Sequence, residues 1–231
     1  MTRCCGKAWL RNLVGAWLIG ATLPAPAQVA PDAADLARYV GLHAAAAQGS
    51  VAALQRHASA DVNAQDSRGR TPLHVATFLR QREAIRWLAG QGADLGALEG
   101  DRYDAVTIAA VADDEETLRL LLSLGASAKR VTSRYDGTAL IAAAHLGHDG
   151  VVRQLIAAGA PLDHVNNLHW TALIEAVVLG DGGPRHQATV RALLGAGANT
   201  TLTDRQGRTA LDLARSRGHA ALVQMLQAQR R

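Results

Sequence analysis

Thr71-Pro72-Leu73-His74 decides the fold, because variants of this tetrapeptide return along the chain at nearly constant spacing. The variants are Asp104-Ala105-Val106-Thr107, Thr138-Ala139-Leu140-Ile141, Thr171-Ala172-Leu173-Ile174 and Thr209-Ala210-Leu211-Asp212. They begin at residues 71, 104, 138, 171 and 209, so successive copies are 33, 34, 33 and 38 residues apart. A fixed period of this length indicates a repeat architecture, in which each unit buries its apolar face against its neighbours.

A second marker follows the same period. It consists of the glycine-alanine pairs Gly92-Ala93, Gly125-Ala126, Gly159-Ala160 and Gly197-Ala198. Each unit therefore reads as a helix, a turn, a second helix and a loop. The threonine can cap the first helix, and Pro72 suits its first position. Glycines 49, 147, 180 and 218 are expected to end first helices, and the paired glycines to end second helices.

Six units follow from this phasing. Their predicted bounds are 35–65, 66–98, 99–131, 132–165, 166–203 and 204–231, preceded by a flexible start over 28–34. The first unit is two residues short between Gly49 and Ser59, as expected of an N-terminal capping repeat. The last helix, over 220–229, carries three glutamines, as expected of a terminal repeat that faces water.

On these motifs the chain resembles ankyrin-repeat proteins over residues 33–231. More narrowly, the segments 170–176 and 180–186 resemble those of exported ankyrin-repeat proteins of Gram-negative bacteria, which reside in the periplasm. The resemblance implies an all-α solenoid of about six helix-turn-helix units with short loop or hairpin fingers. The third unit departs from the family pattern at Asp104 and Thr107. Arg80 and Asp113 replace helix-ending glycines, so we expect weaker local caps in the second and third units.

Residues 1–27 are predicted to be a cleavable signal peptide. Three cations precede an uncharged, mostly apolar run over 13–23, and Ala25-Pro26-Ala27 fits the cleavage pattern. The alternative is an ordinary buried N-terminal helix. Removing the three cations leaves 21 Lys and Arg against 20 Asp and Glu, so the overall pI no longer favours a nucleic-acid partner. Both cysteines precede the cleavage site, and no membrane span is expected after it. We expect a periplasmic protein, or alternatively a secreted one.

The resemblance also implies where a protein partner would bind. Family members usually touch partners through the residue before the tetrapeptide and through two residues near the end of the first helix. These positions on the concave face and loop tips, together with one neighbour, are Arg70, Phe78, Leu79, Tyr103, Val111, Tyr135, His145, Leu146, Trp170, Val178, Leu179 and Arg208. The helix positions form a mostly apolar strip where a solvated groove would favour polar residues, which favours an interaction site. Alternatively, these side chains pack against one another or against the insertion 180–186.

No chemistry-bearing pattern stands out. The insertion lacks the Lys-Ser/Thr of a phosphate-binding loop and is predicted to be a loop that is structural or contacts a partner. Histidines 43, 74, 148 and 219 are placed to bond neighbouring units. His145 and Glu175 could face the groove together, but no nucleophile or oxyanion donor accompanies them. We therefore expect neither metal nor cofactor and no catalysis.

The predicted function is a monomeric, non-catalytic periplasmic module that binds an unknown protein partner. Alternatives are an accessory or protective factor for an exported enzyme under envelope or oxidative stress, and a secreted effector. The sequence does not identify the partner, because repeat surfaces diverge while the frame stays fixed.

Overall fold

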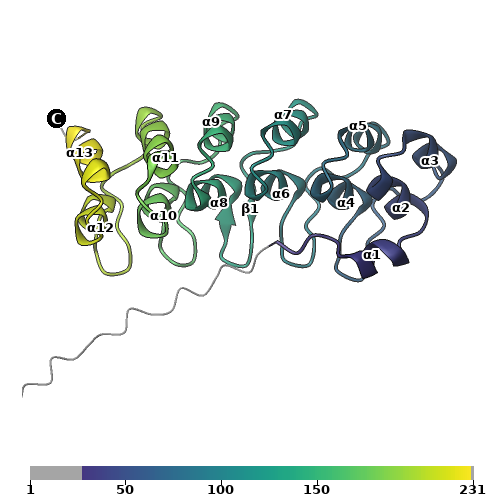
Figure 1. The fold of residues 1–231 in the computed structure, drawn as a ribbon, viewed down its shortest axis with the longest axis horizontal. Coiled ribbons are helices and arrows are strands. Elements are labelled where there is room, and N and C mark those ends of the chain that lie inside the picture. The colour runs from purple at the N-terminus through teal and green to yellow at the C-terminus, as the bar shows by residue number, and fades with distance from the viewer. Residues whose placement is uncertain (1–27, 230–231) are drawn as a thin grey trace, which may run out of the picture.

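The computed structural model describes residues 28–229, which form six helix pairs stacked side by side in one elongated array (Figure 1). The pairs are α2 (Gly41–Gln48) with α3 (Val51–Arg56), α4 (Pro72–Phe78) with α5 (Arg82–Gly90), α6 (Ala105–Val111) with α7 (Glu115–Ser123), α8 (Ala139–Leu146) with α9 (Asp149–Ala157), α10 (Ala172–Val178) with α11 (Pro184–Gly195), and α12 (Ala210–Ser216) with α13 (Ala220–Ala228). A short helix, α1 (Ala33–Arg38), precedes them, and strands β1 (Val131–Thr132) and β2 (Gly137–Thr138) form an antiparallel hairpin in the fourth unit. The predicted solenoid of six helix-turn-helix units is confirmed.

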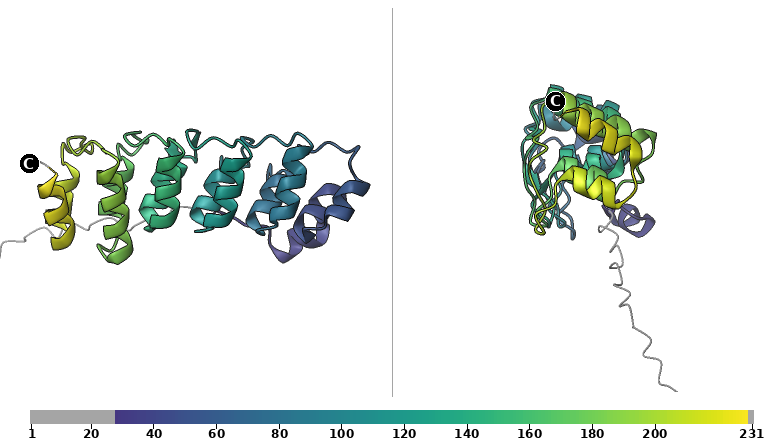
Figure 2. Two further views of the ribbon diagram at one scale, coloured as in Figure 1. Left: turned by 90° about the horizontal axis from the view of Figure 1, so that it is seen from above. Right: turned by 90° about the vertical axis from the view of Figure 1, so that its left-hand side faces the viewer.

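The first helices of the pairs form an inner row and the second helices an outer row. The loops that join one pair to the next, called fingers here, gather along one side of the array (Figure 2). Between the rows lies one continuous core, to which each tetrapeptide contributes its third residue, such as Leu73 and Leu140. Outer helices contribute leucines four residues before the paired glycine, such as Leu88 and Leu155. Small residues such as Ala143, fully buried, let adjacent inner helices approach closely.

Side-chain caps start every inner helix that opens on the tetrapeptide. Each first residue accepts a hydrogen bond from the amide three residues later. The expectation that Asp104 weakens its cap was wrong, since its carboxylate accepts from both the amide and the hydroxyl of Thr107, at 2.8 and 2.7 Å. Arg80 and Asp113 replace glycine at left-handed positions, with φ of 57° and 53°.

The fingers share a turn that the period alone did not reveal. In five fingers one side-chain oxygen accepts the backbone amides two and four residues later; the acceptors are Asp66, Glu99, Ser133, Asn166 and Asp204. Backbone bonds then join the first four of these fingers, as between the Ser133 amide and the Arg102 carbonyl at 2.8 Å, and the Arg205 side chain joins the fifth to the Asn167 carbonyl. This ladder fixes the spacing of the loop tips.

The insertion in the fifth unit differs from the predicted loop. Only its first residues form a loop, because Pro184 takes the first position of α11 and lengthens that helix to 12 residues. Gly180 does not adopt the expected left-handed conformation. Gly182 does, with φ of 69°.

Helix α1 was not predicted, and it begins inside the segment 28–34 that we expected to be a flexible start. The signal-peptide prediction over 1–27 concerns residues outside those that the structure describes. Within 28–229, no helix has the length and apolar character needed to cross a membrane.

Candidate functional site

The candidate site is the inner face, which we define as the C-terminal ends of the inner helices together with the fingers, which lead into the N-terminal ends of these helices. The apolar strip predicted there exists on this face. Phe78, Val111, Val178 and Leu179 are half-buried. Leu146 is 40% exposed, the most open member of the strip. Leu146 is thus an accessible apolar side chain on this face, while these four other members of the strip are half-buried.

The insertion reaches the inner row without covering that surface. The imidazole of His186 hydrogen-bonds the His145 carbonyl oxygen through Nε2, at 2.9 Å, and contacts Asp181 through Nδ1, at 2.8 Å. Arg185 extends further and bonds the Asp113 carboxylate at 2.6 Å. The start of α11 thus braces the ends of α8 and α6, while Leu146 remains exposed.

The finger residues predicted to touch a partner divide into two groups. Trp170 is half-buried with its side chain against the core, Tyr135 is half-buried, and Arg208 is exposed and paired with Asp204. Arg70 and Tyr103 are only 1% and 8% exposed. As they lie in this structure, these two side chains cannot contact a partner, and we correct the predicted surface accordingly.

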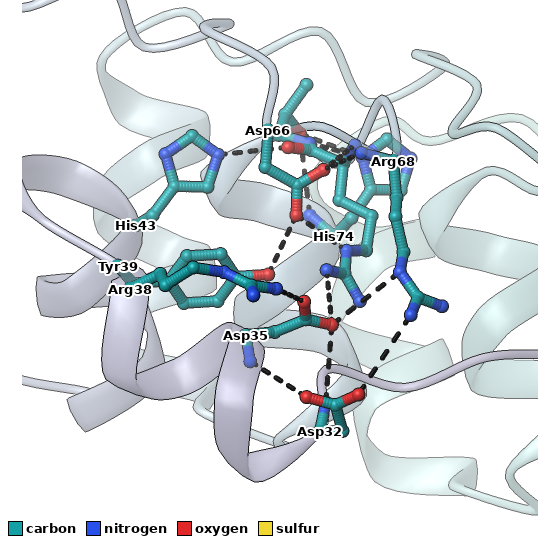
Figure 3. A network of polar contacts seen from close by, with 10 residues as sticks. Asp32, Asp35, Arg38, Tyr39, His43, Asp66, Arg68 and His74 are labelled. Atoms are coloured by element: carbon teal, nitrogen blue, oxygen red, sulfur yellow. Dashed lines mark hydrogen bonds and ion pairs between the residues drawn. The ribbon is translucent and has the colours of Figure 1, made fainter.

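Arg70 is buried, and Asp35 of α1 bonds it. Figure 3 shows Asp35 and Tyr39 facing Asp66 and Arg68 of the first finger. The Arg70 guanidinium donates to Asp35 at 2.8 Å and to Asp66 at 2.7 Å, and it lies 5.9 Å from the centre of the Tyr39 ring. The Tyr39 hydroxyl donates to Asp66 at 2.8 Å. The hydrogen bond from Arg70 is the main cause that lowers the pKa of Asp35 to about 2, so the carboxylate stays charged although it is buried.

Glu175 is the second unusual buried group. It directly follows the tetrapeptide 171–174, at a position where other units carry apolar residues such as Val75 and Leu213. Its carboxylate accepts a hydrogen bond from the side-chain amide of Asn166 at 2.7 Å. It also lies 3.5 Å from His145 Nδ1, so the predicted proximity of His145 and Glu175 is confirmed. Burial raises the pKa of Glu175 to about 7.

Burial also lowers the pKa of His145, with smaller contributions from the nearby His186 and His148. These opposite shifts disfavour the ion pair near neutral pH. Among residues 28–229 no group of three potential ligands could hold a metal ion.

Two of the four histidines expected to join neighbouring units do so, those at positions 43 and 148, whereas His74 bonds a carbonyl of its own unit. His43 contacts the Arg70 carbonyl at 2.9 Å, His74 that of Ala97 at 3.0 Å and His148 that of Ala110 at 2.9 Å. Nε2 of His219 is instead buried without a hydrogen-bond partner.

Sequence reasoning missed Asp35 and its contact with Arg70. The available signal was the pair Asp32 and Asp35, three residues apart, which forms a reciprocal capping box at the start of α1.

Comparison with known proteins identifies the repeat. A family model described as ankyrin repeats (3 copies) matches residues 30–99 and 106–204, and another, ankyrin repeats (many copies), matches 184–227. The ankyrin repeat protein YahD of Escherichia coli is 35% identical over 167 residues, which cover 72% of this chain and 83% of YahD. A crystal structure of an ankyrin repeat domain from Acinetobacter baumannii is 41% identical with a TM-score of 0.76, covering 81% of this chain and 96% of that one. The ankyrin repeat domain of Bcl-3 is 28% identical with a TM-score of 0.74, covering 83% and 86%.

Proposed function

We propose that this chain, which belongs to the ankyrin-repeat family, binds a protein partner through the inner face of its third to fifth units and does so in the periplasm. The family is typically a non-catalytic interaction scaffold, and no observation indicates enzymatic activity. The observation that carries the proposal is the exposed apolar side chain of Leu146 in the middle of the inner face.

The surroundings of Leu146 have the composition of a binding surface. Half-buried apolar residues, Val111 and Val178, come from the neighbouring inner helices, and Trp170 lies on the finger that leads into the N-terminal end of α10. Aromatic and apolar side chains are typical of an interface centre, where a few residues provide most of the binding energy. The rigid helix pairs hold these groups in place before binding, which limits the ordering entropy.

The test is capture of the partner by the purified protein from native envelope extract. Leu146→Asp introduces a charge at the exposed centre of the surface and should reduce capture at least about tenfold, since burying an unpaired charge opposes binding. Ala157→Asp adds the same charge at the exposed end of outer helix α9 and should capture as the wild type does. Trp170→Ala is a poorer probe, because this side chain also packs against the core.

Equal capture by Leu146→Asp and wild type, with unchanged thermal unfolding, contradicts the proposed surface. The proposed location has its own support in the basic start, apolar run and Ala25-Pro26-Ala27 of residues 1–27. Fractionation of cells that express the full chain tests it. The mature protein should leave with the periplasmic fraction, and recovery of uncleaved chain from the cytoplasm contradicts export.

A further inference from the structure

The first part of the inner face is covered by the chain's own helix α1. Of the positions predicted to touch a partner, Arg70 binds Asp35 of α1, and Leu79 lines a depression beside α1. Asp35 of α1 binds the Arg70 guanidinium, and Leu36 and Tyr39 line a depression together with Leu79. The residues labelled in Figure 3 show how α1 presents its acidic side to the first finger.

Charge, not apolar packing, holds α1 in place. Of its six residues only Asp35 is buried, and Leu36 is 38% exposed. The Asp35 carboxylate accepts from Arg70 at 2.8 Å and from Arg38 at 2.7 Å, with Arg68 at 3.7 Å. A buried ion pair sets geometry well but adds little net stability, because desolvation offsets the attraction. Helix α1 is therefore docked in one register and held weakly.

Asp35 also leaves Arg70 incompletely bonded. Nη1 of Arg70 is buried without an acceptor, while Nη2 and Nε donate to Asp35 and Asp66. Only one oxygen of Asp35 bonds Arg70, because the other accepts from Arg38. A guanidinium can bind both oxygens of one carboxylate, and that arrangement is stronger and more specific. A carboxylate from a partner can therefore satisfy Arg70 more fully than Asp35 does.

We propose that Arg68, Arg70 and Leu79 form a binding site for an acidic segment of a partner, and that α1 occupies this site in the unbound chain. The proposal rests on the inner face being the partner surface. The partner segment supplies a carboxylate to Arg70, as α1 does with Asp35, and an apolar side chain to the depression that Leu79 lines. Binding displaces α1.

A synthetic peptide copying residues 28–40 serves as the acidic probe, with an Asp35→Asn peptide as its control. The full chain carrying Asp35→Asn loses its own carboxylate from the site. This chain should bind the peptide at least about tenfold more tightly than wild type, because its site is no longer occupied. A chain with Asp149→Asn, which removes only an exposed pair with Arg153, should bind the peptide as wild type does. Equal binding to the Asp35→Asn and wild-type chains, or equal binding of the two peptides, overturns the proposal.

A second measurement uses only the wild-type chain. It tests the proposal even if the Asp35→Asn chain does not fold. Amides of Leu36 and Tyr39 bond carbonyl oxygens within and just before α1. Saturating peptide should speed their hydrogen exchange at least about tenfold and leave the amides of α6 to α10 unchanged. No change in α1 exchange overturns the proposal. Failure of the proposed function is seen separately, as unaltered partner capture by Leu146→Asp.

Discussion

Replacing Glu175 by glutamine should stabilise the protein at alkaline pH and have little effect at acid pH. The carboxyl titrates near 4.5 in the unfolded chain and near 7 in the folded one. Between these values the folded chain binds more protons than the unfolded chain, so the stability that Glu175 contributes falls as pH rises and levels off above about pH 8. A carboxylate in a stabilising ion pair has the opposite effect, since the stability that it contributes rises with pH.

The magnitude follows from the shift. A difference between 4.5 and 7, at about 1.4 kcal/mol per pKa unit, amounts to about 3 kcal/mol at pH 8 and about 1 kcal/mol at pH 5. Glutamine carries no charge, and its side-chain oxygen can still accept from Asn166. Glu175→Gln should therefore exceed wild type in free energy of unfolding by roughly these amounts.

The assay is urea denaturation followed by helical circular dichroism at several pH values between 5 and 8. His145, whose pKa is lowered, destabilises the folded chain as pH falls through its unfolded value near 6.5, but it is present in both proteins and its effect largely cancels in the difference. Glu116→Gln, which removes an exposed carboxylate from α7, is the control for the loss of a negative charge. A Glu175→Gln difference that stays constant from pH 5 to 8 refutes the reasoning.

Further predictions concern the fingers, the core and α1. Asn166→Ala removes the acceptor of the Leu168 and Trp170 amides and should lower the free energy of unfolding by about 2 kcal/mol in the same assay; no loss contradicts the turn model. His169→Gly relieves a left-handed φ of 67° and should raise the free energy of unfolding by about 1 kcal/mol, whereas a lower free energy of unfolding shows that the position is unstrained. Leu140→Ala, in the core, should cost about 2–5 kcal/mol, and a loss below 1 kcal/mol argues against a continuous core. Because the pKa of Asp35 is lowered from 3.8 to about 2, hydrogen exchange should show α1 docked above pH 4 and released as pH approaches 2; release already at pH 5 contradicts the ion pair.

The repeat frame could be predicted because each unit repeats the same local chemistry. The threonine cap, the leucine at the third position of the tetrapeptide and the paired glycine recur. Five imperfect copies of the tetrapeptide therefore indicate one repeated structure. Helix α1 occurs once and has no period, and only the Asp32–Asp35 box marks it.

The candidate site was predicted less completely, because a position within the repeat does not determine exposure. Arg70 and Arg208 occupy equivalent positions, and each pairs with the aspartate four residues earlier. Arg208 is exposed, while α1 covers Arg70. The contact of Glu175 with His145 followed from the period, but its bond to Asn166 depends on the finger turn.

Site-specific photocrosslinking in living cells tests most directly whether the inner face binds a partner. A photoreactive amino acid at position 146, on the inner face, should give a discrete crosslinked product. The same amino acid at position 157, on outer helix α9, should give none. Products of equal yield from both positions, or from position 157 alone, would contradict the account.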